Sequence, residues 1–305
     1  MPLFGAHMSI AGGLHRAIFT ARDCGCQAVQ LFTKSCQQWK ARELTEEEIL
    51  TFRRAFRKSG LRLAIAHDCY LINLASPQHE LYRKSLEAFI EEYHRSERLG
   101  LCYLVTHPGS HNDSGEEAGL ARVAQALDEV HDRCPHHRVQ VLLEVTAGQG
   151  SNLGHRFEHL AKILSLVKEP NRLGVCLDTC HVFAAGYGLS PEREYRATLR
   201  EFDRLIGLKR LKAFHLNDSR KPQTSRVDRH AHIGRGCMGL EPFRLLINDR
   251  RFRRHPMILE TPKENIDGRD MDAVNLKVLR GLVRPIGLAA TRQRSAAVTL
   301  RSHGS

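Results

Sequence analysis

The stretch GVCLD at residues 174–178 decides the fold, because four small or apolar residues run directly into a carboxylate. Seven further runs of the same kind occur along the chain, at residues 3–6, 28–32, 63–66, 103–106, 139–143, 211–214 and 257–259. Each has the length of a strand, and each is apolar on both faces, as in a buried parallel sheet. The sequence therefore predicts eight buried parallel strands.

Helical patterns separate these runs. Thr45 and Glu48 form a capping box, and Gly60 closes the segment that follows. Residues 82–93 place apolar side chains on one face of a second helix, which is expected to end at Gly100. Less regular helical patterns occupy residues 116–132, 155–168, 191–207 and 240–248. Alternating strands and helices predict an α/β protein, a single-domain (β/α)₈ TIM barrel over residues 1–283.

Composition sets limits on the kind of protein. Residues 284–305 contain four arginines and no acidic residue, which predicts a basic, disordered tail. The formal net charge of +12 favours a polyanionic partner such as nucleic acid.

No basic leader or membrane-length apolar run is evident, so we expect a cytoplasmic protein without a membrane partner. The nine cysteines form neither a disulfide framework nor a CxxC zinc motif, and we expect them to be reduced and mostly buried.

Six of the eight runs stop at a residue that can bind a metal. The separations between these residues are about one strand–helix unit each, and the residues are His67, His107, Glu144, Asp178, His215 and Glu260. In a barrel, all six would meet at the carboxyl ends of the strands, where active sites of this fold lie. A single histidine after a strand would carry little weight, but six histidine or carboxylate residues in corresponding positions indicate a site.

Two short motifs add further ligands. Asp178 is followed by His181, and Asp228 is followed by His230 at a spacing that puts both side chains on one side of an extended segment. The nine candidates exceed what one ion uses and fit two or three ions. Imidazole with carboxylate suits Zn²⁺, Mn²⁺ or Fe²⁺ better than Mg²⁺ or Ca²⁺. Clustered divalent ions serve phosphoryl chemistry, which agrees with the basic charge.

Motifs along nearly the whole predicted barrel resemble the endonuclease IV family of AP endonucleases. They are GAHMSIAGGL (5–14), LFTK (31–34), QQW (37–39), HDCYLINLASP (67–77), HPGSH (107–111), EVTAGQGSNLGHRFEHL (144–160), GVCLDTCHVFAAGYGL (174–189), HLNDS (215–219), SRVDRHAHIGRGCMG (225–239) and ILETP (258–262). The resemblance implies a hydrolase of the deoxyribonuclease IV type in base excision repair. It would cut double-stranded DNA 5′ to an abasic site and leave a 3′-hydroxyl end.

The resemblance also implies three zinc ions per chain, with Mn²⁺ as an alternative at one site. The ligand sets it implies are His67, His107 and Glu144 for the first ion; Glu144 as a bridge, with Asp178, His215 and Glu260, for the second; and His181, Asp228 and His230 for the third. Glu260 and Glu144 are the implied catalytic residues, with Glu260 orienting the attacking hydroxide.

Contacts with DNA are implied at several loop residues. Tyr70 and Leu71 match a loop that enters the duplex, and extrusion of a nucleotide is easiest where no base is stacked. Gly12 and Gly13 are candidates for close approach to phosphate. Gln37 stands where the family often has an arginine, so the DNA distortion at that point is in question.

Two more departures from the family pattern lie near the ligands. Val145 replaces an asparagine that commonly follows the bridging glutamate, which removes a hydrogen bond to a ligand. His232 replaces a common asparagine and would add an imidazole beside the third ion. None of the nine ligands is changed.

Two other functions remain open from the sequence. A sugar isomerase or epimerase on a similar barrel would use one or two ions and would need neither Asp228-Arg229-His230 nor a basic surface. A binder of damaged DNA without catalytic activity would keep the fold and the charge. The expected partner is double-stranded DNA with abasic sites, bound by a monomer in the cytoplasm, at the nucleoid.

Overall fold

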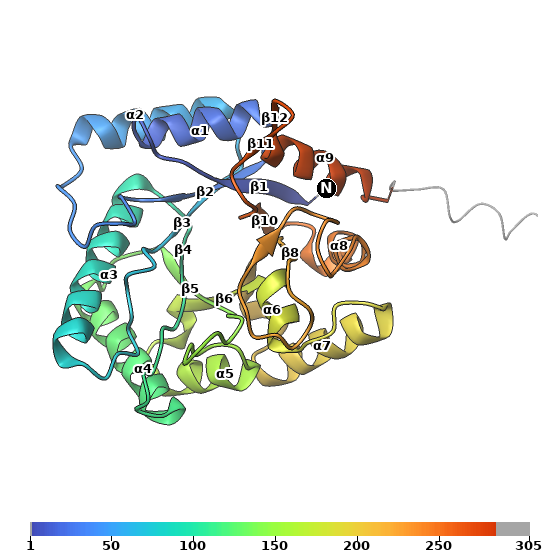
Figure 1. Ribbon diagram of the computed structural model, residues 1–305. Coiled ribbons are helices and arrows are strands. Elements are labelled where there is room, and N and C mark those ends of the chain that lie inside the picture. The colour runs from blue at the N-terminus through green and yellow to red at the C-terminus, as the bar shows by residue number, and fades with distance from the viewer. Residues whose placement is uncertain (1, 285–305) are drawn as a thin grey trace, which may run out of the picture.

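The computed structural model describes residues 2–284 and contains a closed barrel of eight parallel strands (Figure 1). In barrel order, the strands are β1 (Leu3–Met8), β10 (Pro256–Leu259), β7 (Leu211–His215), β6 (Leu173–Asp178), β5 (Gln140–Glu144), β4 (Tyr103–Thr106), β3 (Leu63–His67) and β2 (Ala28–Phe32). Each predicted run forms one of these strands, so the predicted (β/α)₈ barrel is confirmed.

Helices surround the barrel. They are α1 (Leu14–Asp23), α2 (Glu46–Ser59), α3 (His79–Leu99), α4 (Glu116–Arg133), α5 (Phe157–Leu166), α6 (Thr179–Ala185), α7 (Glu192–Leu205), α8 (Glu241–Ile247) and α9 (Met271–Gly281), with short 3₁₀ turns η1 (Pro170–Arg172), η2 (Leu208–Arg210) and η3 (Arg250–Phe252). The predicted capping box is present, since Thr45 accepts from the Glu48 backbone and the Glu48 side chain accepts in return. The sequence patterns do not predict α1, α6 and α9. Helix α1 was missed because it has no side-chain N-cap, and α6 was missed because its seven residues are too few for a periodic pattern.

Two-stranded ladders stand outside the barrel. The strands β8 (Asp218–Ser219) and β9 (His230–Ala231) pair antiparallel, as do β11 (Asn265–Ile266) and β12 (Arg269–Asp270). Of the predicted basic tail, only Arg284 lies within the described residues. No helix in the described part of the chain combines the length and apolar character that crossing a membrane requires.

The barrel interior is a packed layer to which each strand contributes one residue. These residues are Leu3, Ala28, Ile65, Val105, Leu142, Cys176, Ala213 and Ile258. Gly5 lies just above this layer, where a Cβ atom would come within 2.2 Å of the Ala28 carbonyl oxygen. Because side chains alternate along a strand, the residue two positions after each layer member faces the same interior. The layer thus forms the floor beneath the residues at the strand ends.

Candidate metal centre at the carboxyl ends of the strands

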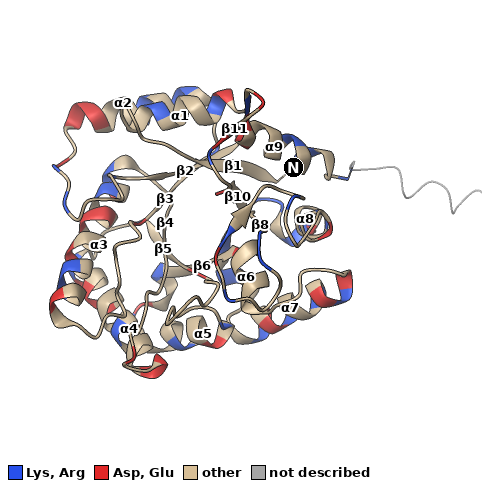
Figure 2. Cartoon of the chain, viewed as in Figure 1, with Lys and Arg blue, Asp and Glu red and all other residues tan. Residues whose placement is uncertain are grey.

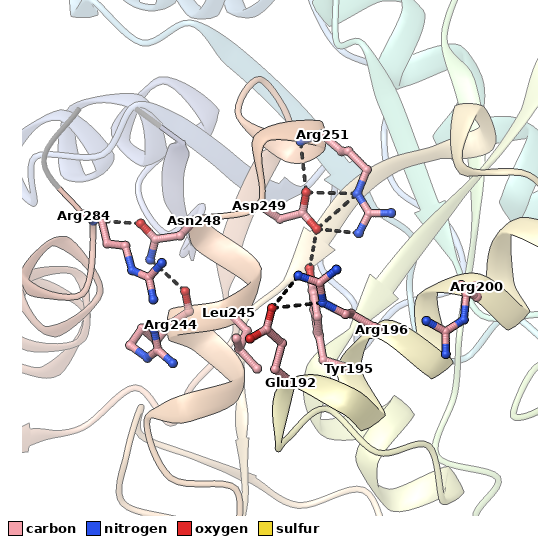
Figure 3. Close-up of a pocket in the computed structure, with 10 residues that line it drawn as sticks. All are labelled: Glu192, Tyr195, Arg196, Arg200, Arg244, Leu245, Asn248, Asp249, Arg251 and Arg284. Carbon is pink, nitrogen blue, oxygen red and sulfur yellow. Dashed lines mark hydrogen bonds and ion pairs between the residues drawn. The ribbon is translucent and has the colours of Figure 1, made fainter. Parts of the chain in front are cut away.

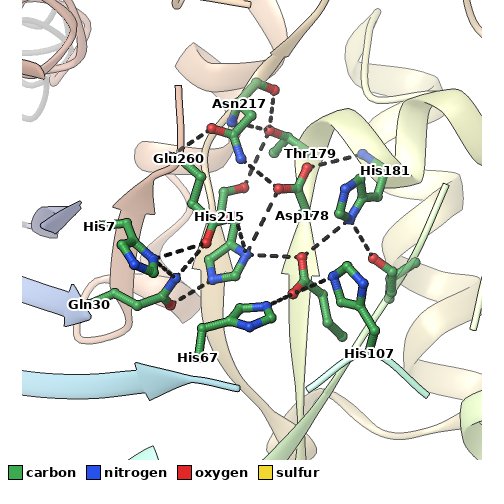
Figure 4. A network of polar contacts seen from close by, with 12 residues as sticks. His7, Gln30, His67, His107, Asp178, Thr179, His181, His215, Asn217 and Glu260 are labelled. Atoms are coloured by element: carbon green, nitrogen blue, oxygen red, sulfur yellow. Dashed lines mark hydrogen bonds and ion pairs between the residues drawn. The ribbon is translucent and has the colours of Figure 1, made fainter. Parts of the chain in front are cut away.

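The six predicted strand-end ligands each lie two positions after a residue of the interior layer. His67 follows Ile65, Glu144 follows Leu142, and Glu260 follows Ile258 in this way. The period of two therefore turns all six side chains inward above the floor of the barrel. With His181, Asp228 and His230 they form what we call the ligand cluster. Figure 4 shows His107 and His181 on one side of the barrel opening and His215 with Glu260 on the other.

Glu144 occupies the centre of the ligand cluster and is fully buried. Its Oε2 lies 3.0 Å from Nε2 of His67 and 3.3 Å from Nε2 of His107. Its Oε1 lies 2.9 Å from Nδ1 of His215 and 3.2 Å from Nδ1 of His181. The two carboxylate oxygens thus face different pairs of imidazoles, which is the arrangement that a bridging carboxylate requires.

A second group surrounds His215. Its Nδ1 lies 3.1 Å from Oε2 of Glu260 and 3.9 Å from Oδ2 of Asp178. All three residues lie at the ends of barrel strands, β7, β10 and β6. Together with the near oxygen of Glu144, they offer one nitrogen and three carboxylate groups to an ion.

The third group consists of His181 from α6, His230 from β9 and Asp228, which precedes β9. The carboxylate of Asp178 caps α6 by accepting from the backbone N–H of His181 at 3.0 Å, which directs that imidazole into the cluster. Nε2 of His181 lies 3.1 Å from one Asp228 oxygen, and Nε2 of His230 lies 3.2 Å from the other. The spacing of Asp228 and His230 brings both side chains to one point, as the sequence predicted.

Hydrogen bonds from surrounding residues orient the ligands. The Asn217 amide donates to Asp178 at 2.6 Å, and its oxygen accepts from the Glu260 backbone at 2.9 Å. Gln30 donates to the Glu260 carboxylate, and its oxygen lies 2.8 Å from Nε2 of His215. His7 lies 3.0 Å from the Gln30 amide (Figure 4). Such contacts fix the orientation of metal-binding side chains.

Sequence reasoning did not assign these three supporting residues. A signal was present for two of them, because Gln30 is the single polar residue of the run at 28–32 and His7 follows the run at 3–6. Both lie on the interior face of the barrel for the same reason as the ligands. Asn217 lies two residues after His215 in the motif HLNDS, but no role was predicted for it from the sequence.

The charge state of the cluster is set by its own members. Burial opposes ionisation of Glu144, but the neighbouring His215 and His107 hold the pKa of its carboxyl well below the ordinary value. Burial likewise opposes protonation of His181, yet Asp178 and Asp228 hold the pKa of its ring well above the ordinary value. A metal binds imidazole only in the deprotonated form, so metal and protons compete for this site.

The donor set fits divalent transition metals. Buried carboxylates and imidazoles are costly unless they are paired or coordinate an ion. Here Glu144, Asp178 and His215 are all fully buried and converge. His67, His107 and Glu144 form one group whose ligand atoms lie within 4.8 Å of one another, and Asp178, His181 and His230 form another. Mixed nitrogen and oxygen donors match the zinc-class metals that the sequence predicted.

The structure changes the interpretation of both departures beside the ligands. Val145 is buried, and its backbone carbonyl lies 3.0 Å from Nδ1 of His181, so the main chain can orient this ligand without an asparagine. His232 does not add an imidazole to the cluster. Its Nε2 lies 2.8 Å from Glu264 and its Nδ1 lies 3.0 Å from the Asn275 amide, so both ring nitrogens are engaged elsewhere.

The predicted DNA-contact residues lie on exposed loops next to the cluster. Tyr70 is 65% exposed, Leu71 is partly buried and Gln37 is exposed. The thiol of Cys69 donates to the Cys36 carbonyl at 2.6 Å, which ties the loop that carries Tyr70 to the loop that carries Gln37. The two loops therefore present their tips as one surface.

The remaining two candidates for DNA contact, Gly12 and Gly13, lie directly after β1. Both have positive φ, 79° and 117°, which favours glycine. Trp39 packs against the core, and the Lys84 ammonium lies 4.5 Å from the centre of its ring. The tryptophan is therefore half-buried and held in place by packing.

Positive charge borders the ligand cluster on one side. The segment that includes β8 and β9 carries five basic residues that are exposed or partly exposed, Arg220, Lys221, Arg226, Arg229 and Arg235. Figure 2 shows this basic segment running beside β8 at the barrel opening. Such a surface suits the phosphates of a nucleic acid backbone.

A separate cavity of about 480 Å³ lies between α7 and α8 (Figure 3). Its arginines are largely paired, with Arg196 on Glu192 at 2.6 Å and Arg251 on Asp249 at 2.6 Å. No member of the ligand cluster lines it. Each of these ion pairs lies within one segment, and the Tyr195 hydroxyl, which donates to Asp249 at 2.9 Å, joins α7 to the turn after α8.

Comparisons with known proteins agree with this geometry. A family model described as a xylose isomerase-like TIM barrel matches residues 18–282. A relative from Chloroflexus aggregans, named probable endonuclease 4, is 52% identical over 286 residues, which cover 93% of this chain and 99% of the relative. The crystal structure of endonuclease IV from Thermus thermophilus matches with a TM-score of 0.81 and 37% identity, covering 92% of this chain and 98% of that one.

The barrel alone is shared more widely. A D-tagatose 3-epimerase-like protein of known structure matches with a TM-score of 0.69, covering 92% of this chain and 96% of its own, at 17% identity. At that identity the likeness concerns the fold alone. Function therefore has to be argued from the site.

Proposed function

The chain belongs to the endonuclease IV family, and on this premise we propose that it is a zinc-dependent AP endonuclease of base excision repair. It hydrolyses the DNA phosphodiester 5′ to an abasic site and leaves a 3′-hydroxyl end. The proposed complement is three zinc ions per chain, with Mn²⁺ as an alternative at one site. The proposed enzyme acts as a monomer, in the cytoplasm, where it associates with DNA of the nucleoid.

One observation carries the proposal: the two oxygens of Glu144 face separate imidazole pairs, and a further group around Asp228 adjoins them. This supports a multinuclear centre in which Glu144 joins two ions and His181, Asp228 and His230 hold another. A sugar epimerase would have no need of the Asp228 group. The basic segment at residues 220–235 further favours a polyanionic substrate.

Zinc ions bound there would activate a water, neutralise phosphate oxygens and stabilise the leaving alkoxide. The protein's own residues position the reaction. Glu260 is held between Gln30 and His215, so its carboxylate is fixed at the mouth of the barrel, where it orients the attacking water. Asn217 connects Asp178 to the backbone of Glu260, which keeps two ligands in a fixed relation.

Selection of abasic DNA is assigned to the neighbouring loops. Tyr70 and Leu71 are proposed to enter the duplex, with Gln37 beside them and Gly12 and Gly13 near the phosphates. Exposure of Tyr70 and the link between the two loops support this role. An abasic nucleotide has no base to unstack, so its extrusion costs less than that of an intact nucleotide.

The deciding experiment uses zinc-loaded protein and two duplexes that differ by one abasic analogue. We expect nicking of the duplex with the analogue and no nicking of the undamaged one. A Glu260→Gln variant should keep its fold and lose most turnover, whereas Glu264→Gln, outside the ligand cluster, should behave as wild type. Tight binding without nicking at full zinc occupancy would instead identify a binder of damaged DNA.

A further inference from the structure

A second group of metal-binding side chains lies at the other end of the barrel. His94 comes from the last two turns of α3, and Cys134 and His137 come from the turn between α4 and β5. Helices of this fold run back toward the amino ends of the strands, so these residues lie on the face opposite the ligand cluster. We refer to His94, Cys134 and His137 as the amino-end triad.

The local structure brings the triad together. The carbonyl of Cys134 accepts from the backbone N–H of His137 at 3.3 Å, which closes the turn CPHH at residues 134–137. The guanidinium of Arg172 donates to the same carbonyl at 2.6 Å and holds the turn against the barrel. Nε2 of His137 lies 2.8 Å from Nδ1 of His94.

The separation between Cys134 and His94 matches that of two ligands of one metal ion. Sγ of Cys134 lies 3.6 Å from Nε2 of His94. Zn–S and Zn–N bonds of ordinary length at a tetrahedral angle separate the two donor atoms by about 3.5 Å. One donor atom from each member of the triad lies within 4.8 Å of the others, the same relation that holds for His67, His107 and Glu144 in the ligand cluster.

The surroundings of the triad affect both the access of an ion and the protonation of the ligands. Cys134 is 1% exposed, whereas His94 is exposed and lines a surface pocket of about 590 Å³, so an ion can reach the triad at His94. Burial raises the pKa of the Cys134 thiol although Arg133 and Arg172 act in the opposite direction, so a bound ion would have to displace the thiol proton. Burial and the neighbouring His94 lower the pKa of His137, which favours the neutral ring that binds metals.

We propose that the amino-end triad binds one divalent transition metal of the zinc class, separate from the ligand cluster, through a thiolate and two imidazoles. This donor set selects Zn²⁺, Co²⁺ or Ni²⁺ over Mg²⁺ and Ca²⁺. The ion would tie α3 to the turn before β5 and leave a coordination position for water. Metal analysis of the whole protein would then count one ion more than the ligand cluster holds.

Cobalt distinguishes the two sites, because the nine residues of the ligand cluster offer only nitrogen and oxygen donors, and the nearby thiol of Cys180, within 4.8 Å of ligand atoms of Asp228 and His230, can be removed separately. A bound Co²⁺ ion with a thiolate ligand gives a sulfur-to-metal charge-transfer absorption that such a cluster does not give. We expect this absorption when the full-length protein is loaded with Co²⁺, and its loss in Cys134→Ser together with one equivalent of metal. His94→Asn and His137→Asn should each weaken Co²⁺ binding at this site by at least tenfold.

Two matched controls and an activity assay make the test decisive. Cys180→Ser, beside the ligand cluster, and Cys102→Ser, an exposed cysteine, should retain the absorption. The three triad variants and Cys102→Ser should nick abasic DNA at the wild-type rate, so failure of the second site and failure of the nuclease proposal are distinct results. No charge-transfer absorption in wild type, its survival in Cys134→Ser, or its indifference to both histidine variants would each overturn the proposal.

Discussion

The side-chain amide of Gln30 donates a hydrogen bond to the carboxylate of Glu260, a residue 230 positions later in the chain. The contact crosses the mouth of the barrel between β2 and the end of β10. Through its oxygen, Gln30 also faces the ring of His215. One amide therefore orients two members of the ligand cluster.

Replacement of Gln30 by leucine should slow nicking of abasic DNA by about 10–100-fold, because Glu260 and His215 lose the group that orients them. The rate is measured at saturating zinc, with zinc content determined on the same sample. Gln38→Leu, an exposed change in the nearby loop, serves as the control. If the Gln30→Leu variant keeps the wild-type rate and zinc content, Gln30 does not position the ligands.

Metal removal should destabilise the fold, because Glu144, Asp178 and His215 are buried and lie close together. An ion at 1,000 times its Kd contributes about 4 kcal/mol, which corresponds to a Tm change of roughly 8 °C. We expect chelation to lower the Tm by at least this amount and zinc to restore it. The effect should be much smaller in Glu144→Gln, and an equal effect in both proteins would contradict the role of Glu144.

Tyr70→Ala should weaken binding to abasic duplex by about tenfold or more, since stacking on an aromatic ring contributes ~1–3 kcal/mol. Its ring is 65% exposed, so the free energy of unfolding should change little. Fluorescence anisotropy with matched abasic and intact duplexes measures the effect. A uniform loss on both duplexes would indicate a contact with the DNA backbone in place of insertion.

Gly5→Ala should destabilise the barrel by at least about 2 kcal/mol, because a Cβ there would lie 2.2 Å from the Ala28 carbonyl oxygen. The neighbouring strand cannot move without opening the barrel. Gly281→Ala, where a Cβ would meet no atom within 4 Å, is the matched control and should be neutral or slightly stabilising. Urea denaturation of the three proteins tests both expectations.

His131 should make stability fall at acid pH. Burial and the charge of Arg172 lower its pKa to about 4, and neither ring nitrogen has a hydrogen-bond partner among residues 2–284. Below its ordinary pKa of ~6.5 the unfolded chain takes up the proton first, so stability is lost as pH falls from about 6.5 toward 4. The contribution is about 2 kcal/mol over this range.

The variant His131→Phe tests this contribution by difference. The gap in unfolding free energy between variant and wild type should move in favour of the variant between pH 7 and pH 4. The exposed His79, changed to asparagine, should show no such trend. A constant gap for His131→Phe would mean that this ring does not resist protonation in the folded state.

Much of this protein was determined by local sequence. Eight apolar runs marked the strands, because a parallel strand covered on both faces needs an unbroken apolar segment. The capping box at Thr45 and the glycine at position 60 set the ends of α2 through contacts within a few residues. The residue types at six strand ends predicted a metal centre, since the barrel topology alone turns them toward one point.

Only the tertiary structure showed how the residues of the ligand cluster are grouped and which hydrogen bonds orient their side chains. The sequence did not show that each oxygen of Glu144 faces its own pair of imidazoles, or that the Val145 carbonyl orients His181 while His232 turns away to Glu264. It also gave no sign of the contact between Gln30 and Glu260. These contacts form because eight strands close into a barrel, which brings residues that are distant in sequence within hydrogen-bond distance. A pattern of neighbouring residues along the chain carries no information about these pairs.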